Sequence, residues 1–323
     1  MSADQWARVS NDAFNVALFG YVVAMVGYFH YLAFRKLPVW RVASAVTWIA
    51  LGAQTVSIVT RGLAAGRVPW GNLYEYSSML AALTVAAYLI LVEWRAKMRT
   101  VGGFVLAFVV LTMAVAVSFL YVGPAPLVPA LNSYWIRIHV VAAIIGSSLL
   151  ALGGGVLTGL YLFQDRRERR RDELAAGGVP PIAGGATGLE AGTTDPDAPP
   201  DLVADETATE PAPRRRGTLP PAATLDRLAY RTIAFAFPIW TFAVIAGAIW
   251  AQEAWGRYWG WDPKETWSFI VWVVYAGYLH ARSTAGWRGR RAAVIALVGF
   301  AALMVNYYVV NTVVDGLHSY SGV

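Results

Sequence analysis

Trp255-Gly-Arg-Tyr-Trp-Gly-Trp-Asp-Pro-Lys-Glu-Thr-Trp267 gathers aromatic side chains into one short segment between two long apolar runs. Its rings belong to Trp255, Tyr258, Trp259, Trp261 and Trp267. Because Gly256 and Gly260 have no side chains, a flat partner could approach the backbone closely beside the rings. We call this segment the tryptophan loop. It is either a binding surface or an aromatic belt of the kind that forms where membrane helices meet water, although a belt does not require glycines between the rings.

The end of the tryptophan loop predicts a well-defined helix start. Asp262 suits an N-cap, Pro263 suits the first helical position, and Glu265 stands three residues after the cap, as in a capping box. The loop is therefore expected to be held against a helix that begins immediately after it.

The composition predicts a membrane protein. Of the 323 residues, 57% are hydrophobic and only 14% are charged, with a mean hydropathy of +0.47. A soluble domain carries about 25% charged residues. Apolar runs of about 18 residues or more are long enough to span a bilayer, and segments this apolar must be helical because lipid offers the backbone no hydrogen-bond partners. The predicted fold is all-α and polytopic, with about eight membrane helices near residues 14–32, 42–60, 77–93, 101–121, 135–163, 231–252, 267–281 and 292–313.

Basic residues predict the orientation in the membrane. They concentrate in three connections, which contain Arg35, Lys36 and Arg41; Arg95, Lys97 and Arg99; and Arg282, Arg288, Arg290 and Arg291. Connections rich in Lys and Arg face the cytoplasm. The tryptophan loop and both termini are then expected outside, and Arg61 and Arg67 conflict mildly because they fall in an outer loop. Asp4 and Asp12 precede the first apolar run without a basic region, which indicates an uncleaved first span rather than a signal peptide.

The middle of the chain has a different composition. A basic run from Arg166 to Arg171 is followed by a stretch of Gly, Pro, Ala, Thr and acidic residues with few large apolar side chains. Such a stretch cannot bury enough surface to offset its ordering entropy, so we predict a disordered cytoplasmic linker with its basic flanks on the anionic inner membrane surface. The predicted organisation is 1–163 (about five helices), 164–227 (linker) and 228–323 (about three helices).

Several functional classes are excluded or disfavoured. The chain has no cysteine, so any thiol chemistry belongs to a partner, and without Cys-x-x-Cys-His the chain is not itself a c-type cytochrome. The glycines at 153–155 lie in an apolar run with no preceding strand, which disfavours a nucleotide-binding loop. Gly155 and Gly159 predict close helix packing instead.

Two of the four histidines are expected on the side of the tryptophan loop. His139 follows Trp135 by four residues, which places the imidazole and the ring on one helix face. His318 follows the last predicted span. Imidazole is a common axial ligand of haem iron, and two histidines on this side favour ligation over a plain solvated role.

The other two histidines are expected deeper. His280 lies thirteen residues beyond Trp267, or about 20 Å at 1.5 Å per residue, where an ionisable group is a functional hypothesis by default. His30 lies close to Arg35 and Lys36, which favours an interfacial polar role.

The segment Trp261-Asp-Pro-Lys-Glu-Thr-Trp267 resembles the tryptophan-rich signature of the CcsA (also ResC) branch of the haem-handling WWD family, which serves cytochrome c maturation by system II. Three further segments resemble the family's histidine motifs: Pro129-Ala-Leu-Asn-Ser-Tyr-Trp-Ile-Arg-Ile-His139, Tyr278-Leu-His-Ala-Arg282 and Gly316-Leu-His-Ser-Tyr320. Pro69-Trp-Gly-Asn-Leu-Tyr-Glu75 also resembles a family loop, to which no chemistry is attached. The resemblance covers the chain from about residue 59 onward, except for the linker.

The resemblance implies a subunit of a cytochrome c synthase in the cell membrane, or in the thylakoid membrane of a plastid or cyanobacterium. Haem b, as transported substrate, would be held at an inner site by His280 and would pass to the outer face, where His139 and His318 ligate the iron. The tryptophan loop would cradle the ring through Trp255, Tyr258, Trp259, Trp261, Asp262 and Trp267. Arg257 and Lys264 either neutralise the propionates or are interfacial charges.

The implied partners are a ResB-like membrane protein, an apocytochrome c with its Cys-x-x-Cys-His motif and, indirectly, a thiol reductase; no nucleic acid is implied. Two other functions stay open on the sequence: a haem exporter or chaperone without a role in bond formation, and a transporter of another flat apolar anion. The sequence also leaves open whether this subunit catalyses the thioether bond or only positions the reactants.

Overall fold

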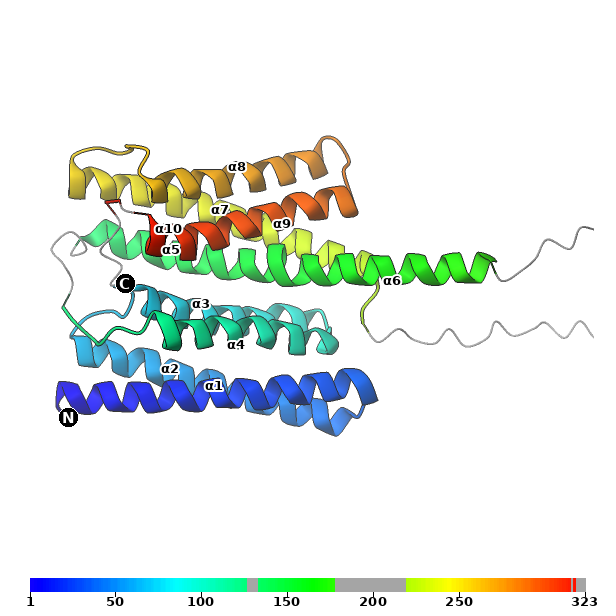
Figure 1. The fold of residues 1–323 in the computed structure, drawn as a ribbon, viewed down its shortest axis with the longest axis horizontal. Coiled ribbons are helices and arrows are strands. Elements are labelled where there is room, and N and C mark those ends of the chain that lie inside the picture. Colours follow the sequence, from blue (N-terminus) through cyan, green and yellow to red (C-terminus); the bar gives the residue numbers. More distant parts are fainter. Residues whose placement is uncertain (127–132, 178–218, 315, 318–323) are drawn as a thin grey trace, which may run out of the picture.

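The computed structural model describes residues 1–126, 133–177, 219–314 and 316–317, and over these residues all regular structure is helical. Figure 1 shows the helices lying side by side as one elongated bundle. The predicted all-α polytopic fold is confirmed. The elements are α1 (Ala3–Phe34), α2 (Leu37–Ala65), α3 (Leu73–Ala87), η1 (Tyr88–Arg95), η2 (Arg99–Val101), α4 (Gly102–Phe119), α5 (Tyr134–Leu150), η4 (Ala151–Leu157), α6 (Thr158–Gly177), α7 (Ala222–Trp255), α8 (Pro263–Ser283), α9 (Arg290–Met304), η5 (Val305–Val309) and α10 (Val310–Val313).

The number of membrane helices agrees with the expectation of about eight. Seven helical segments in the described part of the chain are long and apolar enough to cross a membrane: α1, α2, α3 with η1, η2 with α4, α5 through α6, α7, and α9 through α10. The eighth helix of the bundle is α8, which packs against α7 and α9. Its many Trp and Tyr residues and its charged ends make it less apolar than the other helices.

The two ends of the bundle differ in charge. Figure 1 shows the connections α1–α2, α3–α4 and α8–α9 at one end and the N-terminus, the tryptophan loop and α10 at the other. The three basic connections predicted from the sequence therefore lie together, which is the arrangement that the positive-inside rule requires. We refer to the end with the tryptophan loop as the loop end.

The structure gives Arg61 and Arg67 a packing role at the loop end. Both pair with the buried carboxylate of Glu75: Arg61 Nε lies 3.0 Å from Glu75 Oε1, and Arg67 Nη1 lies 2.8 Å from Glu75 Oε2. The Arg61 guanidinium also lies over the Tyr74 ring, 4.8 Å from its centroid. These arginines share one carboxylate and belong to the packing, so they are not free loop charges of the kind that the orientation rule counts.

Three consecutive glycines allow the helices to approach one another in the middle of the bundle. Side chains added at Gly153, Gly154 and Gly155 would meet Thr232, Tyr275 and Phe300, which come from α7, α8 and α9. A side chain added at Gly159 would meet nothing within 4 Å. Close packing was therefore predicted correctly for Gly155 but wrongly for Gly159, because η4 is a π-helical turn that changes which positions face the neighbouring helices.

The predicted linker, 164–227, is narrower in the structure. Helix α6 continues to Gly177 and projects beyond the bundle (Figure 1), and α7 begins at Ala222. One ion pair ties α6 to α9 before it projects: Arg290 Nε lies 2.6 Å from Asp165 Oδ2, and Asp165 also pairs with Arg169 on the next turn of α6. Residues 178–218, on which most of the disorder prediction falls, lie outside the described residues.

One hydrophobic core joins the two predicted membrane segments. Buried residues of α1 to α4, such as Phe14 and Leu106, belong to the same cluster as Leu225 of α7 and Tyr307 of η5. The linker therefore separates two segments of the sequence, but both segments contribute to the same hydrophobic core.

Candidate functional site

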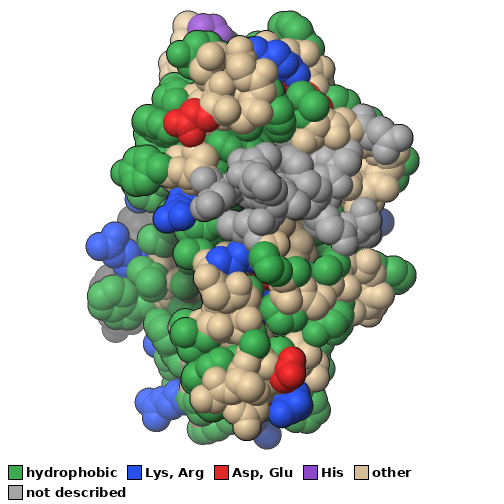
Figure 2. Space-filling view, turned by 90° about the vertical axis from the view of Figure 1, so that its left-hand side faces the viewer, with side chains coloured by type: hydrophobic (Ala, Val, Ile, Leu, Met, Phe, Trp, Pro, Cys, Tyr) green, Lys and Arg blue, Asp and Glu red, His purple; other side chains and the backbone are tan. Residues whose placement is uncertain are grey.

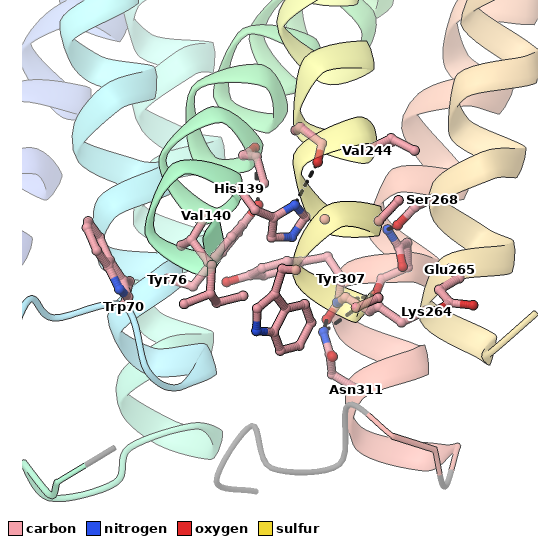
Figure 3. Close-up of a pocket in the computed structure, with 18 of the residues that line it drawn as sticks. Trp70, Tyr76, His139, Val140, Val244, Lys264, Glu265, Ser268, Tyr307 and Asn311 are labelled. Carbon is pink, nitrogen blue, oxygen red and sulfur yellow. Dashed lines mark hydrogen bonds between the residues drawn. The ribbon is translucent and has the colours of Figure 1, made fainter. Parts of the chain in front are cut away.

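A pocket opens at the loop end of the bundle (Figure 3). Its walls come from α5, α7, α8, α9 with η5, and the segment that precedes and begins α3. The space in the pocket and its open mouth measures about 1190 Å³. Aromatic side chains dominate the walls: Trp70, Tyr76, Trp240, Trp250, Trp255, Tyr258, Trp259 and Tyr307. Large, mostly apolar concavities with a few polar groups are the usual form of a small-molecule site.

His139 lies in this pocket with a defined orientation. The N-cap Ser133 starts α5 by accepting the backbone N–H of Trp135, and His139 follows one turn later. The Nδ1 atom lies 2.7 Å from the carbonyl oxygen of Ala243 on α7. Because a carbonyl oxygen only accepts, Nδ1 donates, and in the neutral imidazole the lone pair is then on Nε2. A backbone carbonyl that sets the tautomer of a histidine is typical of metal-ligating imidazoles.

Gly247 makes room for this imidazole. A Cβ atom at Gly247 would lie 2.7 Å from Nδ1 of His139, closer than such contacts occur. Helix α7 thus supplies both the hydrogen-bond acceptor and the gap that the ring fills.

The tryptophan loop has the caps that the sequence predicted. Helix α7 ends at Gly256, whose φ of 71° is left-handed. The capping box of α8 is complete: the Asp262 side chain accepts from the backbone N–H of Glu265, and Glu265 Oε2 accepts from Asp262 N at 3.0 Å. Asp262 Oδ1 also accepts from Lys264 N at 3.0 Å. Glu265 Oε2 also accepts from Gly260 N at 2.8 Å. A single carboxylate therefore fixes the loop on both sides of Trp261.

The structure brings only part of the predicted aromatic set to the pocket. Trp255, Tyr258 and Trp259 line it. Trp261 is 66% exposed and does not line it, and Trp267 is half-buried and packs against the core cluster formed by α7, α8 and α9. Figure 2 shows the loop end of the molecule, where hydrophobic side chains gather between isolated charged ones.

The other predicted ligands lie in different places. His280 is exposed on α8 near the opposite end of the bundle, and His30 is exposed on α1 beside Phe34, with 4.6 Å between ring centroids. His318 lies outside the described residues. The residue before it, Leu317, donates its backbone N–H to Asp262 Oδ2 at 2.8 Å. Asp262 does not line the pocket but connects this segment to the tryptophan loop.

A polar strip crosses one wall of the pocket. Lys264 Nζ donates to the carbonyl oxygen of Asn306 at 3.1 Å, and Asn306 Nδ2 donates to Ser268 Oγ at 3.1 Å. Two acceptors on this wall, Glu265 Oε1 and Asn306 Oδ1, are buried without a protein partner. Lys264 stands in the first turn of α8, before the apolar part of that helix. Burial lowers the pKa of the Lys264 ammonium group to about 7, and the nearby charge of Asp262 opposes this shift. Arg257 lies beside Glu265, at 3.8 Å, outside the lining.

Five of the eight aromatic residues in the wall were not predicted from the sequence: Trp70, Tyr76, Trp240, Trp250 and Tyr307. Trp70 stands in the segment Pro69–Glu75, to which the family resemblance attached no chemistry. Tyr307 lies in η5 on the last span. Tyr307 bonds to Ser77 of α3, with 2.6 Å between the hydroxyl oxygens. The available signal was the Trp-Gly pair at 70–71, because the same pair occurs twice in the tryptophan loop, at 255–256 and 259–260.

Fold and site together define a polytopic helical membrane protein with an aromatic, histidine-containing pocket at one end of its bundle. A family model described as "Cytochrome C assembly protein" matches residues 70–318, and the chain belongs to this family. It functions in cytochrome c biogenesis.

Similar proteins agree with this assignment. The chain is 37% identical to the "Cytochrome c biogenesis protein CcsA" of Gloeobacter violaceus, over 99% of this chain and 98% of the other. It is 36% identical to the protein of that name from Synechocystis, covering 97% and 98% of the two chains, and 34% identical to that from Porphyra purpurea, covering 97% of each. Its fold is similar to that of a solved "Cytochrome c Heme Lyase CcmF", with a TM-score of 0.62 at 17% identity. That match covers 95% of this chain and 47% of the other, so this chain spans about half the length of that protein.

Proposed function

We propose that this chain binds haem in the pocket at the loop end and presents it for thioether attachment to an apocytochrome c. The observation that carries the proposal is His139, an imidazole with a defined tautomer inside an aromatic pocket. Protein ligands of haem iron are most often imidazoles, and apolar rings suit the faces and edges of a porphyrin.

The residues present fit haem b as the substrate. The apolar walls would exclude water from the ring, and the strip containing Lys264 would receive its anionic edge. His139 would supply one axial ligand. His318 would supply the other, which is supported by the bond that ties the preceding residue, Leu317, to Asp262 of the tryptophan loop.

The chemistry assigned to this site needs no oxidant. Each cysteine thiol of the apocytochrome motif would add its S–H across one haem vinyl group, forming a C–S bond and a C–H bond. The thiols must arrive reduced, and this chain has no cysteine to reduce them. A thiol reductase is therefore an indirect partner in the proposal.

The inner site of the proposal is His280. The His280 side chain is exposed on α8. Gly277 lies one turn away, and a side chain added at Gly277 would meet no atom within 4 Å. An exposed imidazole at this level has room for a second protein on its far side, so a ResB-like membrane partner would supply the opposite ligand. The basic connections near His280 would face the cytoplasm, and the loop end would face outside.

The absorption spectrum of the purified protein tests the proposal. We expect a low-spin, bis-histidine spectrum that His139→Ala abolishes without removing the protein from the membrane. His30→Ala is a matched control, because it removes an exposed imidazole from another helix. A preparation without haem would favour the transporter of another flat anion.

A second measurement separates a synthase component from a haem exporter or chaperone. We expect co-expressed apocytochrome c to acquire thioether-linked haem in the presence of this chain and its membrane partner. Haem-loaded protein that transfers haem to the apocytochrome without forming the bond would identify a chaperone instead.

A further inference from the structure

One face of α8 points away from the rest of the chain. Phe269, Val273, Gly277 and His280 follow one another at spacings of four, four and three residues, which places them along one side of the helix. Phe269 is 40% exposed and Val273 is 45% exposed, and Gly277 and His280 are also exposed. We call this row of residues the α8 stripe.

The α8 stripe leads into the rim of the pocket. The Phe269 ring lies 6.3 Å from the Trp259 ring and 6.2 Å from the Trp261 ring, both edge to face, and it is stacked on Trp272 at 6.0 Å. Trp259 also lines the pocket that contains His139. A row of exposed residues on one helix face therefore runs from the level of His280 to Phe269, whose ring contacts reach the rim of the pocket.

The opposite face of α8 is closely packed against the described helices of the bundle. Val271, Tyr275 and Tyr278 are buried there. The Tyr275 ring fills the space left by two glycines: a Cβ at Gly154 would overlap its hydroxyl, and a Cβ at Gly299 would lie 2.8 Å from its Cζ. An interior packed this closely cannot open for a large ring without separating the helices.

We propose that haem moves between His280 and the pocket along the α8 stripe, on the outside of the bundle. This inference rests on the proposed function and specifies the path of its substrate. The path from His280 to Phe269 covers eleven residues, or about 16 Å at 1.5 Å per residue. Gly277 is the point at which a flat ring lies against the helix backbone, because no side chain holds it away there.

Gly277→Leu tests the path, with Gly52→Leu as the matched control. Both glycines are exposed, both lie inside helices, and an added side chain at either would meet no atom within 4 Å, so neither change disturbs packing. We expect Gly277→Leu to lower cytochrome c maturation by at least about tenfold, equivalent to about 1.4 kcal/mol. Gly52→Leu should mature cytochrome c normally.

Haem content then shows where transfer stops. In the otherwise unchanged protein, His139→Ala should remove the haem bound in the pocket. In the Gly277→Leu protein, the pocket should already lack haem, so adding His139→Ala should change nothing while haem at His280 remains.

Three results would overturn the path: normal maturation in Gly277→Leu, loss of haem from both sites, or loss of the membrane partner from the purified Gly277→Leu complex. The last result would identify the stripe as a protein–protein interface. Failure of the proposed function is distinguishable, because His280→Gln and His139→Ala would then both leave haem content unchanged whatever Gly277→Leu does.

Discussion

The orientation of His139 depends on two positions of α7, and this can be tested without touching the imidazole. Gly247→Ala would place a methyl group 2.7 Å from Nδ1 and push the ring away from the Ala243 carbonyl. Loss of a partner that orients a metal-ligating histidine lowers affinity by about 10- to 100-fold. We expect haem occupancy to fall in titrations and the spectrum to move away from the low-spin form.

Gly159→Ala is the control for Gly247→Ala, because nothing lies within 4 Å of a side chain added there. It should bind haem as the unchanged protein does. Equal spectra for the two variants would show that the His139–Ala243 bond does not govern ligation.

Glu75 positions the Trp70 side of the pocket through charge. In addition to the two arginines, its Oε2 accepts the backbone N–H of Gly71 at 2.8 Å, next to Trp70. Glu75→Gln would leave Arg61 and Arg67 without a counter-charge, and breaking a buried pair costs about 3–5 kcal/mol. We expect a large drop in the thermal midpoint in detergent and weaker haem binding. Glu173→Gln, an exposed acid on α6, should leave both unchanged.

At the scale of elements, the buried Tyr275 ring of α8 packs between Gly154 of η4 and Gly299 of α9. Gly154→Ala would overlap the Tyr275 hydroxyl, and overpacking of this kind costs about 1–3 kcal/mol. Tyr275→Phe removes the overlapping oxygen along with its bond to the Ala296 carbonyl. We therefore expect the double variant to be more stable than Gly154→Ala alone, as measured by unfolding in detergent. If the losses of stability in the two single variants simply add in the double variant, the Tyr275 hydroxyl does not limit the space at Gly154.

The π-helical turn η5 shows how one element serves the site. An extra residue in a helical turn re-aims the side chains around it, and such turns occur frequently at functional sites. In this chain, η5 directs Asn306 and Tyr307 into the pocket, where Tyr307 packs on Tyr76 with 4.7 Å between ring centroids. The last span thus contributes to the wall opposite His139.

At the scale of the whole molecule, the absence of cysteine allows a direct test of orientation. Ser2 and Ser283 are exposed at opposite ends of the bundle. We expect a membrane-impermeant maleimide to label Ser2→Cys in intact cells and Ser283→Cys only after the membrane is opened. The reverse pattern would invert the predicted topology and place the pocket on the cytoplasmic side.

Much of the fold could be predicted from the sequence, because the dominant forces act locally along the chain. A backbone in lipid must satisfy its own hydrogen bonds, so long apolar runs specify helices without reference to their neighbours. The capping box of Asp262 and Glu265 is equally local, and it is present as predicted. Clusters of Lys and Arg in the connections likewise specify which ends of the helices lie together.

The composition of the pocket was decided by tertiary structure alone. Trp259 lines the pocket whereas Trp261, two residues away, faces outward. Trp70, just before α3, and His139 line the same pocket only because α3 and α5 pack together. The pairing of Arg61 and Arg67 with Glu75 also depends on how α2 and α3 are joined. These features follow from the direction in which side chains leave helices that are distant in sequence, and no periodicity within one segment encodes that direction.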